Sequence, residues 1–285
     1  YLWDLEVWTG DVVITSSNGW DTTGSGQALW KGMDEVVVST GAKQSLANVV
    51  LSLVDPGDEV ILPAPFWVSY EELVKVAGGT PVILPTSIDN DYKIQPRELE
   101  AAITPKTRIV MYSSPCNPSG SVYTEAETAA LADVLRQHDR IITVSDEIYE
   151  LINFTDKHAS MAAQPGMWER TVTVNGISKG FAMTGWRLGY IGAPTWIAAA
   201  CTKIQGQFTS APSSITQAAA AAALEAQPAL VSDMVCNAPR LVSCCCFSSC
   251  VARMTSPGTN VGEPSLLRKV LTPMMGNSPV CLSIS

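Results

Sequence analysis

The strongest constraint on the fold is an alternation of short β-branched runs with amphipathic stretches between residues 35 and 235. Runs such as Val36–Ser39 favour strands, whereas the apolar spacing over 125–138 is typical of a helix. Pro56-Gly57 marks one of the turns between them. Apolar strands that alternate with helices predict an α/β fold with a mostly parallel sheet covered on both faces. The expected strands are 36–39, 59–62, 80–84, 108–112, 141–144, 171–174 and 188–191, and the expected helices are 41–54, 67–77, 96–103, 125–138, 196–205 and 215–224.

The composition divides the chain into three stretches. Residues 1–34 hold four tryptophans among Gly, Ser and Thr, and show weak periodicity. Residues 236–285 are rich in Cys, Ser and Pro and carry few charges. We therefore expect one large domain over 35–235 between an atypical N-terminal segment and an atypical C-terminal segment, the latter of which could be poorly ordered.

Charge and hydropathy exclude several classes of protein. The 285 residues include 18 Lys and Arg against 27 Asp and Glu, a net charge of -9, whereas proteins that bind nucleic-acid backbones carry a basic surplus. Hydrophobic residues make up 46% of the chain, which is too many for a disordered polymer. No apolar run reaches the length that crosses a bilayer. We expect no nucleic-acid partner and no membrane partner.

Cysteine and histidine usage gives no metal or disulfide signature. Six of the eight cysteines lie within 236–285, and only Cys116 and Cys201 fall in the patterned body. Three adjacent cysteines at 244–246 suit neither a spaced disulfide framework nor a zinc site, so a reduced, cytoplasmic setting is expected. His138 and His158 have no metal-ligand spacing, and we expect neither to be catalytic.

A lysine and an arginine stand eight residues apart just after the expected strand 171–174. They belong to the segment Ser178-Lys179-Gly180-Phe181-Ala182-Met183-Thr184-Gly185-Trp186-Arg187-Leu188-Gly189-Tyr190. This segment closely resembles the cofactor-lysine signature of class I aminotransferases, which belong to the fold-type I group of pyridoxal-phosphate (PLP) enzymes, and it is most similar to their aspartate aminotransferase branch. Four more segments agree with the family in order and spacing: Ser39-Thr40-Gly41-Ala42-Lys43-Gln44, Pro63-Ala64-Pro65-Phe66-Trp67-Val68-Ser69-Tyr70, Ser114-Pro115-Cys116-Asn117-Pro118-Ser119-Gly120 and Ser145-Asp146-Glu147-Ile148-Tyr149-Glu150.

The resemblance covers about residues 35–235. It implies that this stretch is a PLP-binding large domain of the three-layer α/β type, with the family's C-terminal small domain missing or atypical. It also implies that Lys179 forms a Schiff base with PLP and later moves a proton between the substrate Cα and the cofactor as general base. Without the resemblance, Lys179 would be interpreted as an ordinary surface lysine.

The resemblance assigns three further residues to the cofactor ring. Asp146, just past the end of the expected strand 141–144, would pair with the pyridine nitrogen and keep it protonated, so that the ring can accept electrons. Tyr149 and Asn117 would donate hydrogen bonds to the phenolic oxygen. Each has a structural alternative: Asp146 as a helix N-cap, Tyr149 as a core aromatic residue, and Asn117 as a turn residue before a proline.

The cofactor phosphate has its own expected contacts. Arg187 would bind it through two parallel hydrogen bonds, although a surface ion pair is the alternative. The segment Gly41-Ala42-Lys43 stands between a strand and a helix, so its backbone N–H groups would hold the same phosphate, and Ser178 would add a hydroxyl. Trp67 matches the aromatic ring that stacks on the pyridine, with core packing as the alternative.

The family pattern fails at both ends of the chain. None of the 106 residues after Lys179 resembles the family's substrate-carboxylate arginine segment, and residues 1–34 contain no recognisable substrate loop. Both ends therefore look truncated or replaced, and the abrupt change near Cys236 resembles a reading-frame shift. The activity of this exact chain is accordingly open.

The resemblance implies an enzyme that moves an amino group between an amino acid and a 2-oxo acid by ping-pong chemistry. Aspartate and 2-oxoglutarate are the expected pair, and a homodimer is the expected assembly. Two alternatives stay open. One is another PLP fold-type I reaction, such as β-elimination or lyase chemistry, because the cofactor residues do not fix the reaction. The other is a truncated remnant that binds PLP without catalysis.

Overall fold

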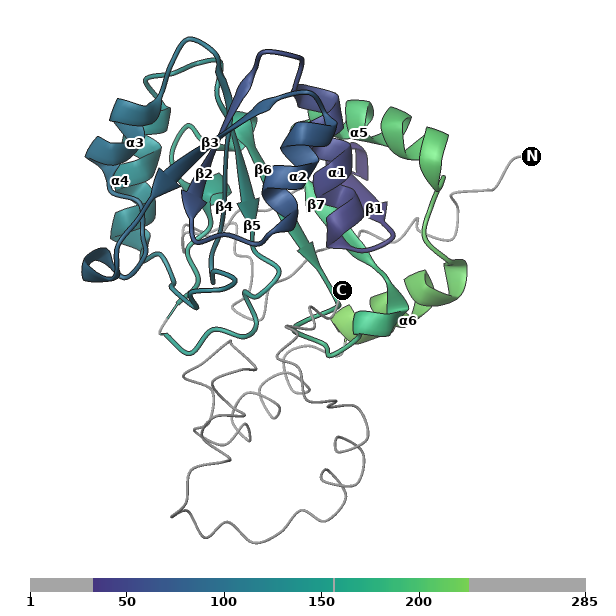
Figure 1. The fold of residues 1–285 in the computed structure, drawn as a ribbon. Coiled ribbons are helices and arrows are strands. Elements are labelled where there is room, and N and C mark those ends of the chain that lie inside the picture. Colours follow the sequence, from purple (N-terminus) through teal and green to yellow (C-terminus); the bar gives the residue numbers. More distant parts are fainter. Residues whose placement is uncertain (1–32, 156, 226–285) are drawn as a thin grey trace, which may run out of the picture. The chain divides into compact units, whose positions relative to one another are not determined.

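The computed structural model describes residues 33–155 and 157–225 (Figure 1). All seven strands and six α-helices expected from the sequence are present, with ends that shift by up to three residues. The strands are β1 (Val36–Ser39), β2 (Glu59–Ala64), β3 (Thr80–Pro85), β4 (Thr107–Ser113), β5 (Ile142–Asp146), β6 (Thr171–Gly176) and β7 (Gly189–Gly192). The helices are α1 (Ala42–Leu53), α2 (Ser69–Val76), α3 (Pro96–Ala102), α4 (Glu125–Leu135), α5 (Thr195–Phe208) and α6 (Ser214–Glu225).

The strands form one mixed sheet in the order β1-β7-β6-β5-β4-β2-β3. Every neighbouring pair is parallel except those of β7, which runs antiparallel to both β1 and β6. The central strands β5 and β6 are buried along their whole length, because helices cover both faces of a parallel sheet. The expected mostly parallel α/β architecture is confirmed.

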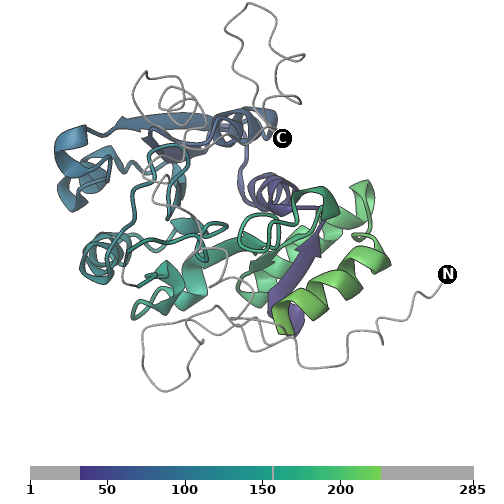
Figure 2. The ribbon, with the colours of Figure 1, turned by 90° about the horizontal axis from the view of Figure 1, so that it is seen from below.

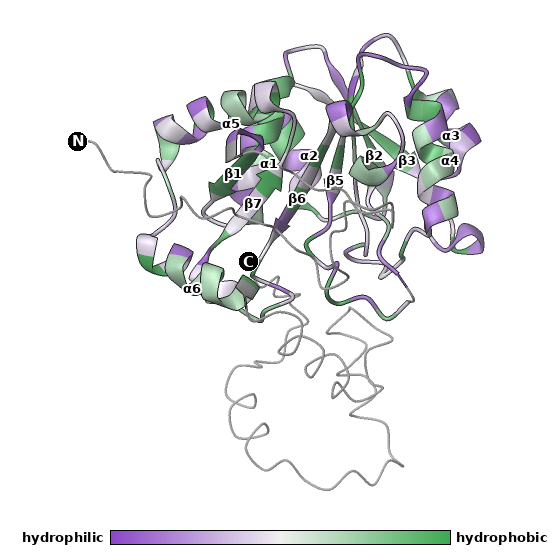
Figure 3. Cartoon of the chain, turned by 180° about the vertical axis from the view of Figure 1, so that it is seen from behind, coloured by the Kyte–Doolittle hydropathy of each residue, from purple (hydrophilic) through white to green (hydrophobic). Residues whose placement is uncertain are grey.

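Successive side chains of the strands pack alternately into two separate hydrophobic cores, one on each face of the sheet. Val60 and Leu62 of β2 pack with α1, α2 and α5, whereas Ile61 between them packs with α3 and α4. Figures 1 and 2 show these two helix groups on opposite sides of the sheet, and Figure 3 shows its strands largely in hydrophobic colours. The two-residue period of a strand produces this division, and the result is a three-layer domain.

Local signals explain where the helices begin. Thr124 caps α4 by accepting a hydrogen bond from the N–H of Glu127, and the Glu127 carboxylate accepts one from the N–H of Thr124 in return. Gln95 and Glu98 form the same kind of capping box at α3, where Pro96 occupies the first turn. These caps satisfy N–H groups that the helix itself leaves without acceptors.

The two terminal segments that we expect to be atypical, residues 1–34 and 236–285, lie outside the described residues, apart from Met33 and Asp34.

None of the described helices is long and apolar enough to cross a membrane.

Candidate active site

The residues expected to hold the cofactor gather at one edge of the sheet. Ser113 at the end of β4 lies opposite Asp146 at the end of β5. Because these strands are parallel, their carboxyl ends lie at the same edge of the sheet. Gly189, the first residue of the antiparallel β7, lies opposite Ser39 of β1 and Gly176 of β6. The start of β7 therefore meets the carboxyl ends of its neighbours, which is where ligands bind in α/β sheets.

Lys179 follows β6 and lies half-buried at this edge. Its Nζ stands 5.8 Å from the centre of the Tyr149 ring. Its charge also slightly lowers the pKa of Asp146, which burial raises, so the amine lies close enough to interact electrostatically with that carboxylate. The structure therefore brings together the three residues expected to be catalytic, which come from the end of β5 and the loops after β5 and β6.

Asp146 is the last residue of β5 and is 4% exposed. Burial raises the pKa of its carboxyl to about 6, although hydrogen bonds from the Tyr70 hydroxyl and the Ile148 N–H lower it. Oδ1 accepts the Ile148 N–H at 3.2 Å, which is a local turn rather than the cap of an α-helix. The carboxylate accepts the hydrogen bond of this turn and also interacts electrostatically with Lys179, so its local bond does not exclude the cofactor role.

The start of α1 forms a cradle that suits a phosphate. Gly41 has a φ of 91°, and a Cβ built on it would stand 2.6 Å from an Nη atom of Arg187. The Arg187 guanidinium thus lies directly against the glycine, where a side chain would exclude it. Only glycine adopts this backbone readily and leaves the room, so the residues present fit a bound phosphate.

The N–H groups of this cradle divide into two kinds. Gly41 N–H already donates to the Ser39 carbonyl at 2.8 Å, so this glycine supplies space rather than a donor. Ala42 and Lys43 open the twelve-residue α1, and the first N–H groups of a helix have no acceptor within it. Of the three residues expected to donate backbone N–H groups to the phosphate, only Ala42 and Lys43 therefore remain candidates.

The remaining expected residues are placed less uniformly. Trp67 is partly buried, and Lys43 Nζ lies 4.9 Å from its ring centre, so the two lie together. Asn117 N–H donates to Ser113 Oγ at 3.4 Å, which keeps its loop close to β4. Ser178 is buried beside Lys179 in the chain, and its contact with a phosphate stays a prediction.

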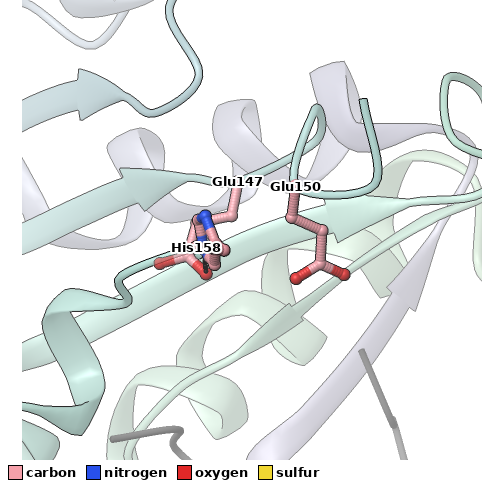
Figure 4. Close-up of side chains that lie close together, drawn as sticks. All are labelled: Glu147, Glu150 and His158. Carbon is pink, nitrogen blue, oxygen red and sulfur yellow. Dashed lines mark hydrogen bonds and ion pairs between the residues drawn. The ribbon is translucent and has the colours of Figure 1, made fainter. Parts of the chain in front are cut away.

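A buried acidic cluster, defined as Glu147, Glu150 and His158, adjoins the site (Figure 4). One potential ligand atom from each lies within 4.8 Å of those of the others. Glu147 already accepts hydrogen bonds from His158 Nε2 at 2.8 Å and from the hydroxyls of Ser145 and Ser160 at 2.9 Å each. Internal partners thus occupy Glu147, and the cluster ties residues 158–160 to the end of β5.

Burial and charge oppose each other within this cluster. Burial raises the pKa of Glu150 to about 7, although the charge of His158 partly offsets this. Burial alone would lower the pKa of His158, but the carboxylates of Glu147 and Glu150 raise it overall. His158, for which no partner is evident along the chain, therefore has a buried carboxylate partner in space.

The sequence interpretation also missed Tyr70. Its hydroxyl donates to Asp146 Oδ2 at 2.6 Å, and its ring meets Trp67 edge to face at a centre distance of 5.8 Å. The signal available was its position three residues after Trp67, since the structure joins the two by a hydrogen bond from the Tyr70 N–H to the Trp67 carbonyl just before and within the start of α2.

Comparison with known proteins identifies the family. The family model for aminotransferase class I and II matches residues 24–242, most of the chain. This chain therefore belongs to the class I and II aminotransferase family, which implies PLP as its cofactor.

Relatives within the family agree on one branch. The chain is 54% identical over 192 residues to a bifunctional aspartate aminotransferase and glutamate/aspartate-prephenate aminotransferase of Petunia hybrida, covering 67% of this chain and 40% of that protein. It is 49% identical over 203 residues to an aspartate/prephenate aminotransferase of Nitrosomonas europaea, covering 70% and 51%. The chain thus spans about half the length of the curated relatives it matches.

Solved structures support the same relationship. The aspartate aminotransferase of Rhizobium meliloti superposes with a TM-score of 0.70 at 42% identity, covering 72% of this chain and 52% of that one. The Thermus thermophilus enzyme with maleate gives 0.68 at 40% identity, covering 71% and 52%. The described fold is therefore that of the aspartate aminotransferases.

Proposed function

We propose that this chain carries the PLP-binding catalytic body of an aspartate-type aminotransferase. The observation that carries the proposal is the meeting of Lys179, Asp146 and Tyr149 at the sheet edge, with Arg187 against Gly41 in the same region. A covalent anchor, a ring partner and a phosphate cradle are the three things that such a cofactor needs from a protein.

Each residue has a chemical task in this proposal. Lys179 Nζ would attach the cofactor aldehyde as a Schiff base with loss of water and, once freed by the incoming amino acid, would accept the proton that leaves the substrate Cα. PLP supplies an electron-accepting ring for that step. Asp146 keeps the ring nitrogen protonated, and Tyr149 and Asn117 donate to the phenolic oxygen.

Positioning falls to the remaining residues. Arg187 and the N–H groups of Ala42 and Lys43 hold the phosphate, with Ser178 adding a hydroxyl. Trp67 packs against the ring face. Because these groups belong to elements fixed by the sheet, they hold the reacting atoms in place and limit rotation of the cofactor.

The proposed substrates are aspartate and 2-oxoglutarate, which give oxaloacetate and glutamate. The names of the relatives support an acidic amino acid, and the similar Thermus thermophilus structure is one with maleate, a dicarboxylate. We further propose a homodimer, which rests on the family resemblance. A reducing, cytoplasmic setting agrees with the free thiols of Cys116 and Cys201.

The first experiment tests cofactor attachment. PLP is added to the 285-residue chain, the absorbance is recorded, and the complex is reduced with borohydride and digested for mass spectrometry. We expect a band in the near-ultraviolet to visible range and a pyridoxyl group on Lys179. Lys179→Ala should lose both, whereas Lys203→Ala, which removes an exposed lysine of α5, should keep them. No band in folded protein would overturn the proposal.

The second experiment tests turnover. The loaded chain is mixed with aspartate and 2-oxoglutarate, and oxaloacetate and glutamate are measured over time. Equal amounts of the two products support transamination. In a parallel reaction with serine alone and no oxo-acid acceptor, formation of pyruvate and ammonia would show an elimination instead. PLP attachment without any product would show a binding remnant and would overturn the catalytic part.

A further inference from the structure

We propose that Tyr70 is a positioning residue that orients the Asp146 carboxylate toward the cofactor's ring nitrogen and keeps it ionised there. This inference rests on the proposed function, because it assigns Asp146 to the ring nitrogen. It concerns a side chain that the sequence motifs left without a role.

The geometry fixes both oxygens of one carboxylate. The Tyr70 hydroxyl donates to Oδ2 of Asp146 at 2.6 Å, a short bond typical of a hydroxyl with an ionised acceptor. The Ile148 N–H donates to Oδ1 at 3.2 Å. Rotation of the carboxylate would therefore break two hydrogen bonds at once. Tyr70 is 1% exposed and Asp146 is 4% exposed, so water does not easily replace either bond.

Tyr70 is itself held in place by the start of α2. Its N–H donates to the Trp67 carbonyl at 3.0 Å, and its ring meets the Trp67 ring at an angle of 89°. Trp67 is the residue proposed to stack on the cofactor ring. The short segment 67–70 at the start of α2 thus carries both the proposed contact for the ring face and the partner of the ring-nitrogen carboxylate.

The Tyr70 hydroxyl also connects Asp146 to the loop after β4. Ser113 lies within hydrogen-bonding reach of the Tyr70 side chain, and its Oγ accepts the N–H of Asn117 at 3.4 Å. Asn117 is the proposed partner of the phenolic oxygen. Tyr70 and Ser113 therefore lie between Asp146 and Asn117, the residues proposed to contact the ring nitrogen and the phenolic oxygen.

The electrostatics require such a donor. Burial raises the pKa of Asp146 to about 6, and the adjacent Glu147 raises it further, while Tyr70, Ile148 and Lys179 lower it. Burial and Asp146 hold the pKa of Tyr70 well above its usual range, so its hydroxyl stays protonated and always donates. Removing that donor should disfavour the charged carboxylate.

The first experiment uses the full chain without PLP. Aspartate is labelled with ¹³C at the carboxyl carbon, the Asp146 signal is identified by its loss in Asp146→Asn, and its titration is followed by NMR. Tyr70→Phe removes only the hydroxyl and should make Asp146 about tenfold harder to ionise. Tyr123→Phe is the matched control. The Tyr123 hydroxyl oxygen also takes part in a buried hydrogen bond, which it accepts from the Ile94 N–H, but this bond does not involve Asp146.

A second variant protects the test against loss of folding. Replacing Tyr70 with 3-fluorotyrosine preserves the side-chain shape and makes the phenol a stronger donor, so Asp146 should become easier to ionise. Opposite changes in the two variants support the assignment, since a packing defect would not reverse sign. An Asp146 titration that is the same in the unaltered, Tyr70→Phe and fluorotyrosine proteins overturns it.

The third measurement uses the chain loaded with PLP. Tyr70→Phe should still bind PLP, because Lys179 and Arg187 are intact. The pH at the midpoint of the titration of the absorbance band should move upward, because a less ionised Asp146 stabilises the protonated ring nitrogen less. In an Asp146→Asn background the same substitution should have no further effect. A midpoint shift of equal size in that background overturns the proposed route through Asp146. Absence of a band in the unaltered chain would overturn the proposed function, whereas the NMR titration judges Tyr70 independently.

Discussion

Individual side chains at the sheet edge carry charges that burial disfavours. Asp146 is buried, and its pKa of about 6 means that folding holds it in a costly charged form at neutral pH. Active sites commonly retain groups that reduce the free energy of unfolding in this way, because the same groups take part in function. Single residues in this region can therefore be tested one at a time.

Asp146→Asn should stabilise the PLP-free chain at high pH. The native carboxyl is a weaker acid in the folded state than in the unfolded state, so its cost appears as pH rises from about 4 and is complete above about 6. We expect a gain of about 1–2 kcal/mol at pH 8 and little at pH 4, measured by urea unfolding. A gain of the same size at both pH values would show that charge is not the cause.

Gly41→Ala should weaken PLP binding about tenfold, or about 1.4 kcal/mol. The new methyl group would displace the Arg187 guanidinium, which a flexible side chain allows, but the cradle would then be narrower. Gly57→Ala is the matched control, because Gly57 has a similar φ of 98° with nothing within 4 Å of an added Cβ. Both variants should lose similar stability, and only Gly41→Ala should lose affinity in an absorbance titration.

The sequence located this site only in part. Lys179 and Arg187 stand within one segment, so their spacing is visible along the chain. Tyr70 and Asp146 are 76 residues apart and meet only because α2 packs beside the end of β5. Likewise, the loss of the Gly41 donor depends on a backbone bond to Ser39, which only the turn geometry determines. Motifs reveal residue types, whereas partners across the sheet require the fold.

At the scale of helices and strands, the alternating pattern predicted every described strand and α-helix but not the order of the strands or the direction of β7. β5 extends two residues beyond its expected end, through Ser145 to Asp146, because pairing with β4 and β6 continues there. α2 begins at Ser69 rather than Trp67, after the segment that follows Pro65. The reversed direction of β7 has no signal in its own apolar residues, since strand periodicity is the same in both directions.

The acidic cluster should make one histidine matter far more than the other. His158→Ala would leave the buried Glu147 without its charged partner, and we expect a loss of about 2–4 kcal/mol in the free energy of unfolding. His138→Ala removes a partly exposed pair with Glu100 at 3.1 Å and should cost under about 1 kcal/mol. Urea unfolding at pH 6 compares the two. Equal losses would mean that the cluster does not fasten residues 158–160 to β5.

For the molecule as a whole, three buried groups make the folded chain hold more protons than the unfolded chain. The pKa values of Asp146, at about 6, Glu150, at about 7, and His158 are all raised above their ordinary values. Stability must then fall as pH rises, because the unfolded state releases protons first. Ionisation of the buried Asp146 and Glu150 lowers the free energy of unfolding between about pH 4 and 7. The stabilising contribution of the His158–Glu147 pair is lost at higher pH, as His158 gives up its proton.

We therefore expect the PLP-free chain to be less stable at pH 8 than at pH 5 by about 2–4 kcal/mol, measured by urea unfolding. Glu150→Gln should reduce this difference, because the amide cannot ionise. A stability that rises over the same range would contradict the burial of these groups.

The reversed strand β7 has a consequence for how firmly a cofactor is gripped. The chain leaves β6 at Gly176, passes Lys179, and re-enters the sheet at Gly189 directly opposite the point of departure. The proposed covalent tether and the proposed anion clamp at Arg187 therefore sit on the two limbs of a single hairpin connection. Lengthening that connection by even a few residues would alter the span between the two attachments while leaving both side chains in place.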